Sequence, residues 1–216
     1  MKYQAIFFDL DGTLIDTAAD FVVTLERLCA NHGIAPPSSE SIRSTVSDGA
    51  RALVKLAFSL QDNNEKIEIY RQELLDIYEQ ELGKNAPLFN EIEPLLQSIK
   101  QHDMPWGIVT NKPRKYTELL LERIGLNVPF VICPCDVKNA KPDPESLFLI
   151  AKLANVDAEK CLYFGDHERD IVAGRAATMD TAACAWGYIA KQDTILEWEA
   201  DYNCYNAAEA SAAAGF

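Results

Sequence analysis

Two kinds of hydrophobic pattern divide this chain. From about residue 16 to residue 82, apolar side chains recur at helical spacing, and no short apolar run typical of a strand interrupts them. In the first helix of this segment, Phe21, Leu25, Leu28 and Cys29 stand at positions i, i+4, i+7 and i+8, which places them on one face. We therefore predict an all-helical segment. Its helices are expected after Asp16, over residues 50–60 and over residues 65–82.

The flanking parts of the chain alternate between short apolar runs and amphipathic segments. This alternation predicts a parallel β-sheet with helices on both faces. We thus predict an α/β fold: a Rossmann-like parallel-sheet core over residues 1–15 and 84–216, interrupted by an all-helical insertion over residues 16–83. The alanine-rich tail, residues 207–215, is expected either as a short helix or as a frayed end. The expected strands cover residues 5–8, 106–110, 130–133, 161–165 and 181–185, and the expected core helices cover residues 90–100, 114–124, 144–154 and 168–177.

The chain is acidic, with a formal net charge of −13 over 216 residues. Such a surface repels nucleic acid and anionic membranes, so neither is an expected partner. No apolar run is long enough to span a bilayer, and the first residues lack the apolar stretch of a secretory signal. The six cysteines are scattered, without the spacing of a zinc site. We expect a cytoplasmic protein with reduced thiols, either a monomer or a homodimer.

Two carboxylates end the first apolar run. Residues i and i+2 of a strand share a face, so Asp9 and Asp11 point the same way if the strand continues past residues 5–8. Two like charges this close need a cation beside them, and Mg²⁺, which prefers oxygen ligands, is the expected one. Gly12 then lets the chain turn. On its own, this stretch is also consistent with an ordinary Asp-Gly turn.

Polar residues also follow the later strands. Thr110 and Asn111 come after the second strand, Lys141 lies between the third and fourth, and Asp166 follows the fourth, with Asp170 one helical turn later. Ligands of open parallel sheets bind beyond the carboxyl ends of the strands, so we expect these side chains to gather on one rim with the opening carboxylates. Taken singly, each also fits a helix cap or a solvated loop residue.

In this order, the motifs resemble the four motifs of the haloacid dehalogenase superfamily. The matching residues are Asp9-Leu10-Asp11-Gly12-Thr13, Thr110-Asn111, Lys141-Pro142, and Gly165-Asp166 with Asp170. More narrowly, the chain resembles the superfamily's phosphatases with a helical cap after the first motif, and the resemblance covers essentially the whole chain. The superfamily's dehalogenases lack the second carboxylate of the opening motif, so the presence of Asp11 disfavours dehalogenation.

The resemblance implies phosphoryl transfer in two steps. Asp9 attacks phosphorus and forms an aspartyl-phosphate. Asp11 protonates the leaving alcohol and then activates the water that cleaves the acyl-phosphate. The resemblance further implies that an Asp9 oxygen, the main-chain carbonyl of Asp11 and Asp166 hold Mg²⁺. Asp170 has a supporting role, in which it orients Lys141 or a water on the metal.

Other residues are implied as contacts of the phosphoryl group and the substrate. Thr110, the backbone N–H of Asn111 and Lys141 hold the transferring phosphoryl oxygens as charge builds on them. Thr13 is a further expected substrate contact. In the cap, Arg51 is the candidate contact for a substrate carboxylate. Arg51 also fits an ordinary surface position on a helix.

The cap sequence, including residues 16–21 and 48–54, resembles that of phosphoglycolate phosphatases and of a bacterial relative, N-acetylmuramic acid 6-phosphate phosphatase. Both substrates carry a carboxylate, so the expected activity is Mg²⁺-dependent hydrolysis of a small, carboxylate-bearing phosphomonoester. A phosphomutase of the same fold and a catalytically idle binding protein are the alternatives, and the filled catalytic positions disfavour the second. One departure from these families is Thr178, where they usually have glycine.

Overall fold

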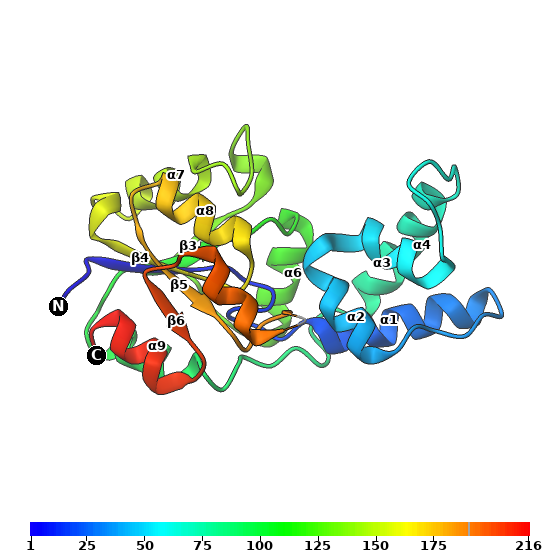
Figure 1. The fold of residues 1–216 in the computed structure, drawn as a ribbon, viewed down its shortest axis with the longest axis horizontal. Coiled ribbons are helices and arrows are strands. Elements are labelled where there is room, and N and C mark those ends of the chain that lie inside the picture. The colour runs from blue at the N-terminus through cyan, green and yellow to red at the C-terminus, as the bar shows by residue number, and fades with distance from the viewer. Residues whose placement is uncertain (190) are drawn as a thin grey trace. The chain divides into compact units, whose positions relative to one another are not determined.

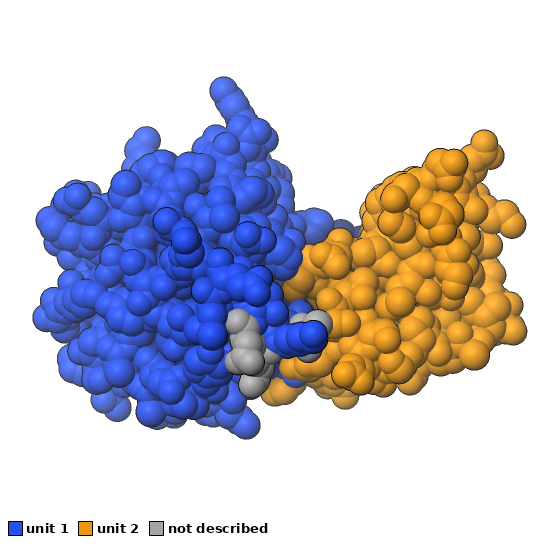
Figure 2. Space-filling model, in the orientation of Figure 1, with its two compact units in different colours: residues 1–16, 88–216 blue, residues 17–87 orange. Residues whose placement is uncertain are grey.

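The chain folds into two compact units. The structure, a computed structural model, describes residues 1–189 and 191–216 (Figure 1). Residues 1–16 and 88–216 form one unit, called the core unit here, and residues 17–87 form the other, the helical unit (Figure 2). Among the described residues, no helix is both long and apolar enough to cross a membrane.

The core unit is built on one parallel sheet. Over the described residues its strands are β1 (Ala5–Phe8), β2 (Trp106–Val109), β3 (Phe130–Ile132), β4 (Cys161–Gly165), β5 (Asp180–Cys184) and β6 (Tyr202–Cys204). Their order is β3-β2-β1-β4-β5-β6, and every neighbouring pair is parallel. The prediction of an α/β fold with a parallel sheet is confirmed. The sequence pattern does not predict β6, because polar Asn203 interrupts this short edge strand.

Helices cover both faces of the sheet (Figure 1). The helices α7 (Glu145–Leu153) and α8 (Glu168–Ala176) lie over one face and contact its strands. On the opposite face, α9 (Ala207–Ala214) packs against α5 (Glu93–Gln101), so the alanine-rich tail is a docked helix. The other helical segments of the core unit are α6 (Arg114–Ile124) and the 3₁₀ turns η2 (Pro134–Asp136), η3 (Ala158–Lys160) and η4 (Gln192–Trp198).

The register of the central strands decides where the polar loop residues leave the sheet. Phe8, the last residue of β1, pairs with Ile108 of β2 and with Phe164 of β4. Asp9 and Asp166 follow these paired positions within one or two residues, so they emerge at the same edge. This is the carboxyl edge, where parallel sheets of this kind bind ligands.

The helical unit contains α1 (Ala18–Asn31), α2 (Ser39–Thr45), the 3₁₀ turn η1 (Val46–Asp48), α3 (Gly49–Phe58) and α4 (Ile67–Glu81). The rings of Phe21 and Tyr78 stack at a centroid distance of 4.0 Å and join α1 to α4. The buried carboxylate of Asp20 accepts hydrogen bonds from the N–H groups of Gly83 (2.6 Å) and Asn85 (2.8 Å). The chain that leaves α4 is thereby tied to the start of α1.

Within the core unit, the two chain segments that border the helical unit are bonded to each other. The N–H of Phe89 donates to the carbonyl of Leu14 at 3.1 Å, and Ile15 and Leu88 form an isolated antiparallel bridge. The core unit therefore keeps these two segments side by side through its own hydrogen bonds.

Thr178 follows α8 in the left-handed region, with φ at 62°. Its N–H donates to the carbonyl of Arg175 (3.0 Å), and the N–H of Met179 donates to the carbonyl of Gly174 (3.0 Å). This is the Schellman pattern of a helix end, in which glycine is the usual residue. A side chain in this conformation costs roughly 1–2 kcal/mol. The position where the chain departs from its resembled families is therefore a strained one.

The variant Thr178→Gly should raise the free energy of unfolding by about 1 kcal/mol, because the relieved strain exceeds the extra unfolded-state entropy of glycine, roughly 0.5–1 kcal/mol. Equilibrium urea unfolding measures the difference. Thr178→Val keeps the branched Cβ and is the matched control, for which no gain is expected. A glycine variant less stable than the wild type would show that threonine is not strained at this position.

Candidate active site

Asp9 lies directly beyond the end of β1, at the centre of the carboxyl edge. Its N–H donates to the carbonyl of Phe164 at 2.8 Å, which continues the β1–β4 pairing and fixes the backbone. One carboxylate oxygen accepts the N–H of Leu10 at 2.7 Å. This hydrogen bond orients the carboxyl group, and the side chain is only 6% exposed to solvent.

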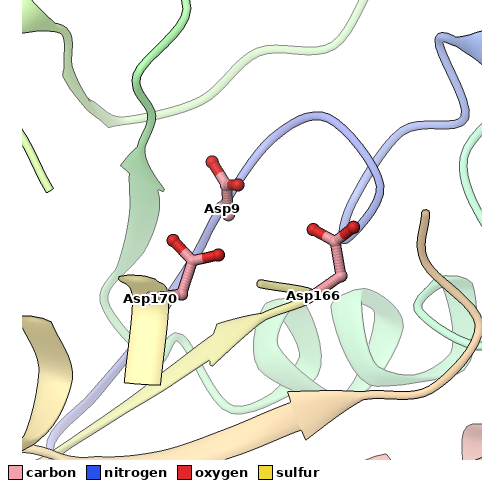
Figure 3. A group of neighbouring side chains, drawn as sticks. All are labelled: Asp9, Asp166 and Asp170. Carbon is pink, nitrogen blue, oxygen red and sulfur yellow. The ribbon is translucent and has the colours of Figure 1, made fainter. Parts of the chain in front are cut away.

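Asp166 emerges from β4 into the same region (Figure 3). One of its oxygens accepts the hydroxyl of Thr13 at 3.0 Å, and the other accepts the N–H of Tyr188 at 2.9 Å. A Cβ atom at Gly12 or Gly187 would clash with the Asp166 carboxyl group. Two glycines therefore make room for this acid, and Gly12 also has a positive φ of 83°.

Lys141 joins the remaining carboxylates of this edge. Its ammonium group lies 3.0 Å from an oxygen of Asp9 and 2.6 Å from an oxygen of Asp170, the acid in the first turn of α8. The ammonium also donates to the carbonyl of Val109 (2.8 Å) and to the hydroxyl of Tyr163 (2.7 Å). The Lys141 side chain is 1% exposed, so these acceptors replace its water shell.

Tyr163 of β4 is a site residue that the sequence reasoning does not identify. Its hydroxyl donates to the carbonyl of Val109 at 2.9 Å while it accepts from Lys141. Burial, and then the nearby charge of Asp170, raise the pKa of Tyr163 well above its usual value, so the phenol stays neutral. The only sign of such a role in the sequence is that a side chain with a hydroxyl group stands inside an apolar strand.

The carboxyl groups of Asp9, Asp166 and Asp170 offer oxygen atoms that lie within 4.8 Å of one another (Figure 3). Burial, followed by the charges of Asp9 and Asp170, raises the pKa of Asp166 to about 8. Burial also raises the pKa of Asp170, against the opposing effect of Lys141. These carboxyl groups ionise with difficulty while no cation is near them. A set of buried oxygen donors of this kind suits a hard divalent cation, which would stabilise their ionised forms.

The loop after β2 brings Thr110 and Asn111 to this edge. The buried Thr110 continues the sheet, since its N–H donates to the carbonyl of Ile132 at 3.0 Å. The Asn111 side-chain amide donates to the main-chain carbonyl of Lys141 at 2.9 Å and fixes the loop that carries this lysine. The next residue, Lys112, ion-pairs with Asp11 at 2.9 Å. Lys112 is not identified from the sequence, because the resembled motif ends at Asn111.

Arg51 belongs to the helical unit. Its guanidinium donates to the carboxylate of Glu68 and to the carbonyl of Asp62, each at 2.8 Å. The side chain is 47% exposed. Its role toward a substrate carboxylate stays a prediction.

The family model described as "Haloacid dehalogenase-like hydrolase" matches residues 6–184 of the chain. An N-acetylmuramic acid 6-phosphate phosphatase from Pseudomonas putida is 39% identical over 203 residues, which cover 93% of this chain and 91% of that protein. The chain belongs to the haloacid dehalogenase-like hydrolase family. A phosphoglycolate phosphatase from Xanthomonas campestris is 38% identical over 200 residues, covering 92% of this chain and 90% of that protein.

The fold of this haloacid dehalogenase-like hydrolase is also found among solved structures. The crystal structure of a protein from Haemophilus somnus, described as a predicted phosphoglycolate phosphatase, superposes with a TM-score of 0.84 and covers 99% of both chains. At 18% identity, this likeness concerns the fold. The superfamily predicted from the sequence is confirmed. The matched range, residues 6–184, spans the strand ends from which the candidate site is built.

The raised pKa of Asp166 predicts how pH and a divalent cation act on stability. Without a cation, the native state holds a proton on this carboxyl group up to a pH of about 8, whereas the unfolded chain loses it near 3.8. Stability from this group is therefore full below pH 4 and is lost as the pH rises toward 8, by on the order of 1 kcal/mol per pH unit. Because Mg²⁺ competes with the proton, it should raise the Tm more at pH 8.5 than at pH 6.

Thermal unfolding after dialysis against EDTA, with and without added Mg²⁺, measures this difference. The variant Asp166→Asn cannot ionise at this position, so most of the Mg²⁺-dependent shift should disappear from it. An equal Mg²⁺ shift at both pH values in the wild type would contradict the competition between the cation and the proton.

Proposed function

We propose that the protein is a Mg²⁺-dependent phosphomonoester hydrolase that acts through an aspartyl-phosphate on Asp9. The observation that carries the proposal is the contact between the Asp9 carboxylate and the buried ammonium of Lys141 at the carboxyl edge of the sheet. A phosphorus atom attacked by Asp9 lies beside this ammonium, where negative charge builds on the transferring oxygens. Thr110 lies on the neighbouring loop and is the proposed second contact of these oxygens.

In the first step, a carboxylate oxygen of Asp9 forms a bond to phosphorus, and the bond from phosphorus to the substrate's alcohol oxygen breaks. Asp11 gives a proton to that oxygen, so a neutral alcohol leaves. Asp11 is suited to this exchange because its side chain is 20% exposed, whereas that of Asp9 is 6% exposed. Asp9, the less exposed acid, is thus the proposed nucleophile, and Asp11, the more exposed acid, is the proposed general acid and base.

In the second step, water attacks the phosphorus of the aspartyl-phosphate. Asp11, now ionised, takes the proton of this water, the bond from phosphorus to Asp9 breaks, and inorganic phosphate is released. Asp9 and Asp11 return to their starting protonation states. The contacts of Lys141 with Asp170 and Tyr163 keep its ammonium in place through both steps.

The residues present fit Mg²⁺. Over the described residues of this edge, four carboxyl groups face two ammonium groups, so the site keeps a surplus negative charge even when Asp11 is protonated for the first step, and a divalent cation would offset it. Asp9, Asp166 and the main-chain carbonyl of Asp11 would hold the ion, all through oxygen atoms. When bound, Mg²⁺ supplies the positive charge that lets an anionic nucleophile approach an anionic phosphate.

The proposed substrate is a small phosphomonoester that carries a carboxylate, with phosphoglycolate as the first candidate. N-acetylmuramic acid 6-phosphate is the second, since proteins that bear these two names are 38% and 39% identical to this chain. The helical unit is the proposed cap, and Arg51 is its proposed contact to the substrate carboxylate. The cytoplasmic location stays a prediction, as does the state of monomer or homodimer.

The variant Asp9→Asn should lower kcat for p-nitrophenyl phosphate in the presence of Mg²⁺ by on the order of 10³-fold or more, because an amide cannot form the covalent intermediate. Phosphate release and circular dichroism are measured together, so that loss of activity is not confused with loss of fold. Asp103→Asn removes the same charge at an exposed loop position and is the matched control. An Asp9→Asn variant with more than about a tenth of the wild-type kcat would rule out Asp9 as the nucleophile.

A phosphate-release screen tests the substrate class and separates a hydrolase from a phosphomutase. Phosphoglycolate and N-acetylmuramic acid 6-phosphate should give kcat/KM values at least about 10-fold above those of glycerol 2-phosphate, which lacks the carboxylate, if one ion pair supplies about 1.4 kcal/mol of selectivity. Arg51→Met should reduce this preference and leave glycerol 2-phosphate unchanged. A flat profile would favour a generalist phosphatase, and conversion without released phosphate would favour a phosphomutase.

A further inference from the structure

A second buried lysine lies at the carboxyl edge. The side chain of Lys112 is 6% exposed, and its ammonium contacts both carboxylate oxygens of Asp11, at 2.9 and 3.2 Å. Removing an ammonium group from water costs several kcal/mol, which a carboxylate partner with good geometry offsets. The ion pair therefore fixes the positions of both groups relative to each other.

The backbone of Lys112 is anchored on the loop after β2. Its N–H donates to the hydroxyl of Thr110 at 3.1 Å, and its carbonyl accepts the hydroxyl of Thr117, in α6, at 3.3 Å. Asp11 lies on a different loop, the one after β1. The ion pair between Lys112 and Asp11 thus joins the two loops that carry the proposed nucleophile and the proposed phosphoryl contact.

The two buried lysines contact different carboxylates. Lys141 contacts Asp9 and Asp170, whereas Lys112 contacts Asp11. Each of the two proposed catalytic acids therefore has its own ammonium group. Lys141, the lysine that contacts Asp9, is 1% exposed, whereas Lys112 reaches Asp11 from the neighbouring loop.

We propose that Lys112 is a positioning residue for Asp11, which it holds toward the leaving-group oxygen of the substrate. This inference rests on the proposed function, in which Asp11 transfers that proton. The ammonium can donate to an oxygen of Asp11 whether or not the carboxyl group carries a proton, so the orientation is kept through the reaction. The ion pair between Lys112 and Asp11 thus affects the step in which the alcohol leaves. Lys141 and Thr110 bind the phosphoryl group.

Two substrates with different leaving groups test this assignment. The p-nitrophenolate group of p-nitrophenyl phosphate leaves without a proton, whereas an alkyl phosphate needs one. The alkyl substrate is the one that the wild type hydrolyses fastest in the phosphate-release screen. In Lys112→Met, kcat/KM for the alkyl phosphate should fall about 10–100-fold, because a misplaced acid loses much of the 10²–10⁴-fold effect of proton transfer. For p-nitrophenyl phosphate it should fall less than about 3-fold.

Further variants separate positioning from phosphate binding and from folding. Lys112→Gln keeps an N–H donor on a side chain that is one bond shorter and should recover part of the loss. Lys152→Met removes an exposed lysine from the last turn of α7 and is the matched control. The inhibition constant of inorganic phosphate should change less than about 2-fold in Lys112→Met. In an Asp11→Asn background, the same substitution should cause no further loss, since the two residues act as a unit.

Equal losses on both substrates with a weaker inhibition by phosphate would overturn the proposal and show that Lys112 contacts the phosphoryl group. Losses that add to those of Asp11→Asn would show that Lys112 acts independently of Asp11. Unchanged kinetics in a folded Lys112→Met variant would assign the ion pair a purely structural role. A wild type that releases no phosphate from either substrate would instead overturn the proposed function, so the two failures are distinct.

Discussion

Three carboxyl groups share one buried region at the carboxyl edge of the sheet, and the repulsion among them constrains much of the core unit. The charge of Asp9 raises the pKa of both Asp166 and Asp170, on top of the effect of burial. The buried ammonium of Lys141 offsets part of this cost, and the N–H and hydroxyl donors at Asp166 offset another part. The proposed cation would neutralise the charge that remains. The repulsion that destabilises the fold therefore also favours binding of a cation.

This constraint explains features that lie outside the acids themselves. Gly165 stands where a side chain would clash with Asp170, just as Gly12 and Gly187 stand against Asp166. These glycines follow from the close approach of the carboxyl groups, because any Cβ would fill the space that they need. The parallel register contributes in the same way, since it brings the ends of strands far apart in the sequence to one edge. The backbone is thus shaped around a cluster of like charges.

The sequence predicts this architecture well where one physical rule decides the outcome. β4 and α6 have the predicted bounds, because an apolar run between polar loops and a helix ended by glycine are both local patterns. β6 escapes prediction because an edge strand with Asn203 at its centre carries no apolar signal. Tyr163 and Lys112 escape it because their roles arise from contacts with residues far along the chain, Lys141 and Asp11.

The bond between Phe89 and Leu14, together with the bridge between Ile15 and Leu88, gives the core unit a seam where the helical unit is inserted. Topologically, the 71 residues from 17 to 87 are a long loop between two neighbouring points of one unit. A single genetic insertion or deletion at this seam changes what stands between residues 16 and 88 without altering the register of any core strand. The helical unit and the core unit can therefore evolve as separate segments of the same gene.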